Sequence, residues 1–185
     1  MDERNEFIYD TNKAELRAML KRYRNELSDK PLLSRAIADR ALQLVGGNVM
    51  VYMSIGSEVD TAYLLDKLAV KNGVTVFAPY TQDGIITPRR LLSRGVADKT
   101  GNLPRECYDN SYIPSKIDFC ITPLLGFNER GYRIGYGKGC YDRFFAEHST
   151  FKIGLAFSGQ AIKFQPECTD IPLDCCVTDK NVIYF

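Results

Sequence analysis

The sequence contains no tryptophan and only one histidine, His148. His148 lies near the end of an expected helix and is interpreted as a surface residue, so the chain offers neither a histidine-based metal site nor a catalytic triad. The 11 tyrosines are spread among expected strands and loops. They form no platform of the kind on which single-stranded nucleic acids stack.

Neither sign of charge is in excess, because 24 Lys and Arg residues balance 23 Asp and Glu residues. The chain therefore has no overall positive electrostatic field that would hold a nucleic acid backbone or an anionic membrane. We expect small molecules as its partners. No apolar run is long enough to span a bilayer, and the opening segment MDERNEFIYD lacks the apolar stretch of a signal peptide. We expect a cytoplasmic protein.

No two cysteines form a Cys-x-x-Cys pair. A cytoplasmic chain keeps its thiols reduced, which indicates neither a disulfide framework nor a zinc site. We interpret the six cysteines as core or incidental residues: Cys107, Cys120, Cys140, Cys168, Cys175 and Cys176.

The pattern of apolar residues predicts an α/β fold in one domain, residues 1–185. Helical spacing over residues 11–27 predicts a first helix, with Thr11 or Asn12 as its cap, and a second helix follows before residue 46. Short, nearly continuous apolar runs indicate buried strands at 48–54, 74–80, 116–123 and 152–158. Helices between them predict parallel crossovers, whereas residues 81–114 indicate a short antiparallel piece. We expect a mixed, mainly parallel sheet with helices on both faces.

Four glycines surround one lysine in the segment GYRIGYGKGCYDRFF, residues 131–145. Glycines at alternate positions let backbone N–H groups approach an anion closely, and the helix expected from Cys140 adds its positive dipole end. Lys138 supplies a full charge. The segment therefore predicts a phosphate site, although it matches neither Gly-x-Gly-x-x-Gly nor the Walker A pattern. A mobile glycine hairpin with an exposed lysine is the alternative.

Asp142 follows the glycines by one helical turn, where its charge would repel a phosphate unless a cation lay between them. Mg²⁺ bridges carboxylates and phosphate oxygens, so we expect Mg²⁺ here, with Asp174 or Asp170 as a second ligand. The alternative is that Asp142 is a solvated first-turn residue favoured by the helix dipole.

Four sequence elements in order resemble the 5-formyltetrahydrofolate cyclo-ligase family, also called methenyltetrahydrofolate synthetase. They are KAELRAML, VYMSIGSEVDT, RIGYGKGCYDRF, and KIGLAFSGQ followed by TDIPLDCCVTD. The resemblance implies a monomeric, three-layer, Rossmann-like enzyme that uses ATP and Mg²⁺ to convert 5-formyltetrahydrofolate into 5,10-methenyltetrahydrofolate. ADP and phosphate are released.

The same resemblance implies roles for individual residues. Lys138 and Arg133 would be the catalytic residues, and Asp142 and Asp174 would bind the metal. The ATP site would comprise Lys13 and Arg17, which share a helix face, and Arg133, Gly135, Tyr136, Gly137, Lys138, Gly139, Cys140 and Tyr141. The folate side would comprise Met53, Glu58, Tyr136, Lys138 and Cys140.

Three positions depart from the family pattern, in which a Tyr, an Asp and a His are usual at Cys140, Asn128 and Thr169. A Glu-Pro pair common in the family is also absent, with NLPRE in that region. Two alternative functions remain: a folate or nucleotide binder without turnover, and an α/β enzyme that acts on a phosphosugar or acyl-CoA. The first predicts binding without formation of the methenyl chromophore, and the second predicts no consumption of ATP.

Overall fold

A computed structural model describes residues 12–185, whose four α-helices lie close to their expected positions. Their bounds are α1 Lys13–Glu26, α2 Lys30–Leu44, α3 Ala62–Ala69 and α4 Cys140–Glu147. The Asn12 side chain accepts a hydrogen bond from the Ala14 N–H and so caps α1, whereas Thr11 lies outside the described residues. None of the described helices has the length and apolar character required to cross a bilayer.

One sheet of eight strands runs through the molecule in the order β10-β9-β8-β5-β1-β2-β3-β4. Five neighbouring strands are parallel: β9 Cys175–Val177, β8 Phe151–Leu155, β5 Phe119–Pro123, β1 Gly47–Val51 and β2 Val74–Gln82. Antiparallel strands complete both ends: β10 Val182–Tyr184, β3 Ile85–Leu91 and β4 Tyr108–Asp109. The mixed, mainly parallel α/β fold is confirmed, as is the antiparallel piece after residue 81.

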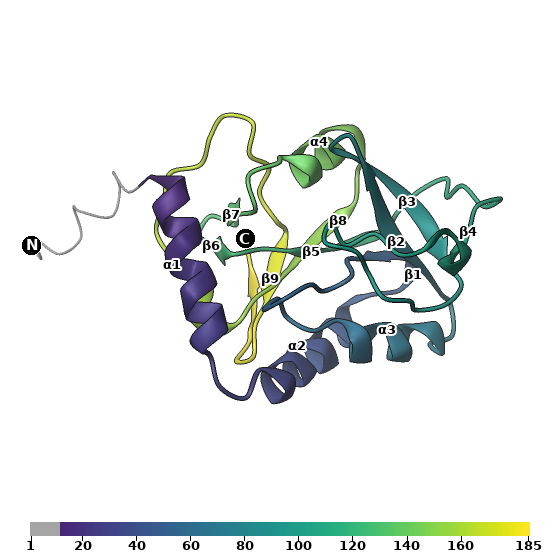
Figure 1. The fold of residues 1–185 in the computed structure, drawn as a ribbon, viewed down its shortest axis with the longest axis horizontal. Coiled ribbons are helices and arrows are strands. Elements are labelled where there is room, and N and C mark those ends of the chain that lie inside the picture. The colour runs from purple at the N-terminus through teal and green to yellow at the C-terminus, as the bar shows by residue number, and fades with distance from the viewer. Residues whose placement is uncertain (1–11) are drawn as a thin grey trace, which may run out of the picture.

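Helices cover both faces of this sheet, with α2 and α3 on one side and α4 on the other (Figure 1). Alternation along β1 explains this arrangement, because successive side chains of a strand point to opposite faces. Val49 and Val51 pack with the residues of α2 and α3, whereas Met50 packs with Phe144 and Phe145 of α4. Both clusters are almost fully buried.

A long connection leaves β5 and enters α4, and it carries the glycine segment. It contains a two-stranded hairpin of β6 Gly126–Phe127 and β7 Arg133–Ile134. Helix α1 stands beside this hairpin (Figure 1), and its Leu16 and Leu20 pack against Leu125 and Ile134. The N-terminal helix is thereby brought next to the glycine segment, which lies more than 100 residues away along the chain.

Candidate active site

A cavity of about 1160 Å³ opens at the carboxyl ends of β1, β2 and β5. Parallel α/β sheets bind their ligands at this edge. The cavity is lined by all but one of the residues expected to form the site: Lys13, Arg17, Met53, Glu58, Arg133, Gly135, Tyr136, Gly137, Lys138, Gly139, Cys140, Tyr141 and Asp142. The exception is Asp174, which lies elsewhere.

The glycine loop, residues 135–139, owes its shape to backbone conformations that favour glycine. Gly137 and Gly139 have φ angles of 91° and 61°. A Cβ atom on Gly137 would lie 3.4 Å from the guanidinium carbon of Arg17. Gly139 is the N-cap residue of α4 and provides no side-chain hydrogen bond, so the first N–H groups of the helix have no side-chain cap. Such N–H groups, together with the helix dipole, form a site suited to an anion.

Lys138 is exposed at the tip of this loop. Its carbonyl accepts a hydrogen bond from the Arg143 guanidinium at 2.8 Å, while its ammonium has no partner within residues 12–185. Arg143 also donates to the carbonyl of Gly84, in the turn between β2 and β3, at 2.9 Å. The loop backbone is therefore tied down, and the Lys138 charge remains available for a ligand.

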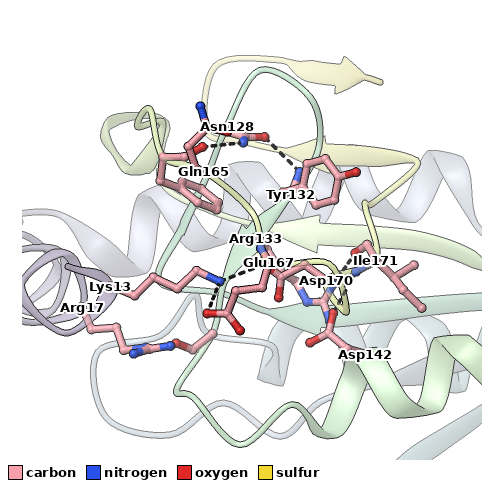
Figure 2. A network of polar contacts seen from close by, with 12 residues as sticks. Lys13, Arg17, Asn128, Tyr132, Arg133, Asp142, Gln165, Glu167, Asp170 and Ile171 are labelled. Carbon is pink, nitrogen blue, oxygen red and sulfur yellow. Dashed lines mark hydrogen bonds and ion pairs between the residues drawn. The ribbon is translucent and has the colours of Figure 1, made fainter. Parts of the chain in front are cut away.

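Lys13 and Arg17 project from α1 toward the cavity (Figure 2). The Lys13 ammonium lies 2.8 Å from Oδ2 of Asp170 and 2.9 Å from Oε1 of Glu167. Burial lowers the pKa of Lys13, but its hydrogen bonds to Asp170 and Glu167, together with their charges, raise it above the usual value. Arg17 donates through Nε to the carbonyl of Gly135 at 2.9 Å. Both cations are thus held at the cavity wall by protein groups.

Arg133 is buried and clamps two segments together (Figure 2). Its guanidinium donates to the carbonyl of Ile171 at 2.8 Å and to Oδ1 of Asp142 at 2.9 Å. The same Asp142 oxygen accepts from the Ile171 N–H at 3.1 Å. The start of α4 is thereby attached to residues 167–171, and both terminal nitrogens of Arg133 are occupied by protein acceptors.

The expected metal pair of Asp142 and Asp174 is not brought together. Asp174 immediately precedes β9, at the amino end of the parallel strands, whereas the cavity lies at their carboxyl ends. Its carboxylate accepts from the Lys152 backbone N–H at 2.6 Å and pairs with the Lys152 ammonium at 2.8 Å. Asp170, the other acid considered, lines the cavity but is paired with Lys13. The described residues contain no cluster of three or more side chains suited to a metal.

Glu58 and Met53 follow β1 and line the same cavity, where the Glu58 carboxylate contacts the Tyr136 hydroxyl of the glycine loop at 2.8 Å. Glu58 is only 7% exposed. Burial raises the pKa of its carboxyl, while hydrogen bonds from the Ile55 N–H and the Tyr136 hydroxyl and the charge of Arg24 oppose this rise. Met53 is also buried, with Tyr52 beside it. The Glu58 carboxylate is therefore shielded from water and held by the Ile55 N–H and the Tyr136 hydroxyl, with the Arg24 charge close by.

The three residues that depart from the family pattern, Asn128, Cys140 and Thr169, make different contacts in the structure. Asn128 is buried, accepts from the N–H groups of Arg130 and Tyr132 at 3.0 Å each, and donates to the carbonyl of Phe164 at 3.2 Å (Figure 2). An ionised Asp could not make the last bond. The Cys140 thiol contacts the Lys138 carbonyl at 3.9 Å. Thr169 lines the cavity.

Comparison with known proteins decides the family. The model of the 5-formyltetrahydrofolate cyclo-ligase family matches residues 9–179. The chain belongs to this family.

Two relatives and one solved structure illustrate the similarity. A 5-formyltetrahydrofolate cyclo-ligase of Mycoplasma pneumoniae is 40% identical over 73 residues, which span 38% of this chain and 44% of the relative. A probable 5-formyltetrahydrofolate cyclo-ligase of Caenorhabditis elegans is 31% identical over 156 residues, or 73% of this chain and 74% of the relative. A 5,10-methenyltetrahydrofolate synthetase structure from Mycoplasma pneumoniae has a TM-score of 0.72 at 26% identity, covering 91% of this chain and 99% of that one. This chain is accordingly a ligase of folate metabolism with the fold of that structure.

Two arginines of this cyclo-ligase that organise the site were not among the expected site residues. Arg143 follows Gly139 by four residues, so helical spacing could have placed it under the glycine loop. Arg24 resembles the other basic residues of α1 in sequence, yet it is 3% exposed and donates to the Tyr136 hydroxyl at 2.7 Å. Its four-residue spacing from Leu16 and Leu20 places Arg24 on the buried face of α1, which is the local signal that could have found it, whereas its partners come from distant segments.

Proposed function

We propose that this chain catalyses the ATP- and Mg²⁺-dependent cyclisation of 5-formyltetrahydrofolate to 5,10-methenyltetrahydrofolate, with release of ADP and phosphate. The observation that carries the proposal is the position of Lys138. Its ammonium, which has no partner among the described residues, lies in a glycine loop directly before the N-terminus of α4. A cation, backbone N–H groups and a helix dipole at one place favour the γ-phosphate of a nucleotide.

Other residues that line the cavity support ATP as the co-substrate. Lys13 and Arg17 line the same cavity, and the backbone of residues 135–141 with the Lys138 side chain would surround the proposed triphosphate. Lys13 would exchange contacts with Asp170 and Glu167 for phosphate contacts. Arg133, whose terminal nitrogens both bind protein acceptors, would act by positioning Asp142 and the start of α4.

The donor set suits Mg²⁺ that is held jointly by protein and nucleotide. Mg²⁺ is commonly bound through one or two carboxylates together with substrate phosphates and water, so a cluster of three protein ligands is not required. Asp142 lines the cavity and uses Oδ1 for Arg133 and Ile171. Asp142 would hold the ion, and Asp174 would not. When bound, Mg²⁺ would neutralise charge on the phosphate oxygens.

The reaction needs no protein nucleophile. The formyl oxygen of the folate attacks the γ-phosphorus, the bond to the β-phosphate oxygen breaks, and ADP leaves. N10 then attacks the activated formyl carbon, loses its proton, and phosphate leaves with the former formyl oxygen. Phosphoryl transfer of this kind depends mainly on positioning and charge stabilisation, which Lys138 and the loop N–H groups would provide.

Glu58 would recognise the pterin ring. A carboxylate has two oxygens and about four lone-pair positions, so it can accept hydrogen bonds from two adjacent N–H donors of a pterin while keeping its protein partners. Met53, with Tyr52 beside it, supplies apolar surface for the ring. The Glu58 carboxylate contacts Tyr136 of the glycine loop, so a pterin bound at Glu58 would lie beside this loop with its formyl group toward the γ-phosphate.

The test mixes purified protein with ATP, MgCl₂ and 5-formyltetrahydrofolate and follows the ultraviolet absorbance of the methenyl product. We expect absorbance to grow with equimolar release of ADP, and no growth when ATP is omitted. Binding of both ligands without absorbance growth would instead favour a binder without turnover. Product formation without ADP release would remove the phosphorylation step.

A further inference from the structure

Three segments meet at the hydroxyl of Tyr136. Arg24 of α1 donates to this hydroxyl at 2.7 Å, and the hydroxyl lies 2.8 Å from Oε1 of Glu58. Arg24 also donates to the carbonyl of Leu124 at 3.2 Å, and Oε2 of Glu58 accepts from the Ile55 N–H at 2.9 Å. The chain of contacts thus begins at Arg24 of α1 and ends at the Glu58 carboxylate, which is proposed to hold the folate.

The direction of these hydrogen bonds follows from their chemistry. A guanidinium only donates, so the Tyr136 hydroxyl must accept from Arg24 and give its single proton to Glu58. Burial and the charge of Glu58 raise the pKa of Tyr136 to about 12, so the hydroxyl keeps that proton at neutral pH. Glu58 Oε1 therefore accepts a hydrogen bond from the Tyr136 hydroxyl.

The contacts from Arg24 through the Tyr136 hydroxyl to Glu58 form a relay, and both of its ends depend on the tyrosine in the middle. Arg24 is 3% exposed and Glu58 is 7% exposed, and their opposite charges reach each other through the hydroxyl. With one partner at each oxygen, the Glu58 carboxylate has a fixed plane and retains one free lone-pair side at each oxygen. A pair of adjacent N–H donors needs one such lone pair at each oxygen.

We propose that Arg24 and Tyr136 are positioning residues that hold the Glu58 carboxylate ionised and oriented for the folate. This inference rests on the proposed function for the identity of the ligand, but the relay itself can be measured without it. Tyr136 follows Gly135, whose carbonyl is bound by Arg17, so the relay also ties the orientation of Glu58 to the glycine loop.

The groups that surround Glu58 give the relay a defined pH signature. Arg24 and Tyr136 face it, and the tyrosines Tyr52 and Tyr141 are also close enough to interact electrostatically with its charge. Burial raises the pKa of Glu58, and the Tyr136 hydrogen bond lowers it. Removing the hydroxyl should therefore move this pKa upward and leave less carboxylate at a given acidic pH.

The first experiment is a ¹³C NMR titration of the Glu58 carboxyl in wild-type protein and in Tyr136→Phe. Tyr136 is 41% exposed, so its replacement should not prevent folding. Tyr63→Phe is the matched control, because it removes a hydroxyl that donates to an exposed carboxylate, Asp39, outside the cavity. We expect a higher pKa for Glu58 in Tyr136→Phe alone. An unchanged value would overturn the relay.

The second experiment separates positioning from direct contact. Tyr136→Phe should raise KM for 5-formyltetrahydrofolate about 10-fold, the equivalent of one charged hydrogen bond, while KM for ATP changes less than about twofold. In a Glu58→Gln background the same replacement should change folate KM by less than about twofold. An undiminished effect there would mean that Tyr136 acts on the folate directly and would overturn the inference. If the wild-type protein makes no methenyl product, the proposed function fails, and the titration still decides on the relay.

Discussion

The Lys13 ammonium donates to Oδ2 of Asp170 at 2.8 Å, which joins helix α1 to the segment that precedes β9. The contact stabilises the ionised lysine, and the pKa of Lys13 is raised above its ordinary value of 10.5. Two chain segments far apart in sequence are thereby held at the wall of the cavity.

The first prediction concerns stability at high pH. A lysine whose pKa is raised on folding contributes stability that is present below its unfolded pKa and lost as pH rises through its folded pKa. As pH rises from about 10 through the folded pKa, wild type should lose more free energy of unfolding than Lys13→Met, by less than about 1 kcal/mol because solvent screens the contact, as measured by urea denaturation. Equal losses in the two proteins would show that the Lys13 contacts carry no net stability.

The second prediction concerns Lys138. Lys138→Ala should slow turnover about 10²- to 10³-fold, because a charge proposed to follow the transferring phosphoryl group is lost. The melting temperature should remain unchanged, since the ammonium has no partner among residues 12–185. Lys180→Ala serves as the control, because this exposed lysine lies away from the cavity. A rate for Lys138→Ala equal to that of the control would remove the assigned role.

The third prediction distinguishes two acids. Asp142→Asn keeps an oxygen for Arg133 and the Ile171 N–H but loses the charge, so half-maximal activity should require at least about fivefold more Mg²⁺. Asp174→Asn should leave the Mg²⁺ requirement unchanged, because its carboxylate is paired with Lys152. Activity measured against Mg²⁺ concentration gives the answer. The reverse result would restore Asp174 as the ligand.

The fourth prediction uses two glycines of one loop. Gly137 has a φ of 91° and lies against Arg17, so Gly137→Ala should destabilise the protein by about 1 to 2 kcal/mol. A Cβ on Gly135 would meet no atom within 4 Å, so Gly135→Ala should leave stability nearly unchanged. If the loop binds phosphate closely, Gly135→Ala should still raise KM for ATP. Thermal unfolding and ATP kinetics together test this, and a normal ATP KM would argue against close backbone approach at residue 135.

The order of helices and strands could be predicted because it depends on patterns that lie within short segments. The buried run around Val49 and Val51 and the helical spacing of Leu16 and Leu20 each reveal one element without reference to the rest of the chain. The glycine loop could be found in the same way, since Gly137 and Gly139 adopt backbone conformations that favour glycine. The pairing of Asp142 with Asp174 could not be judged, because their separation depends on which end of β9 lies nearer the cavity.

The amino-acid sequence by itself determined the alternation of strands and helices and the family, and it singled out the glycine segment that we propose to hold a phosphate, because these follow from local spacing and chemistry. Only the tertiary structure decided the partner of each charge: Arg133 with Asp142, Lys152 with Asp174, and Arg24 with Tyr136. The physical reason is that a buried charge must find a partner in three dimensions, and any distant segment of the chain can supply it.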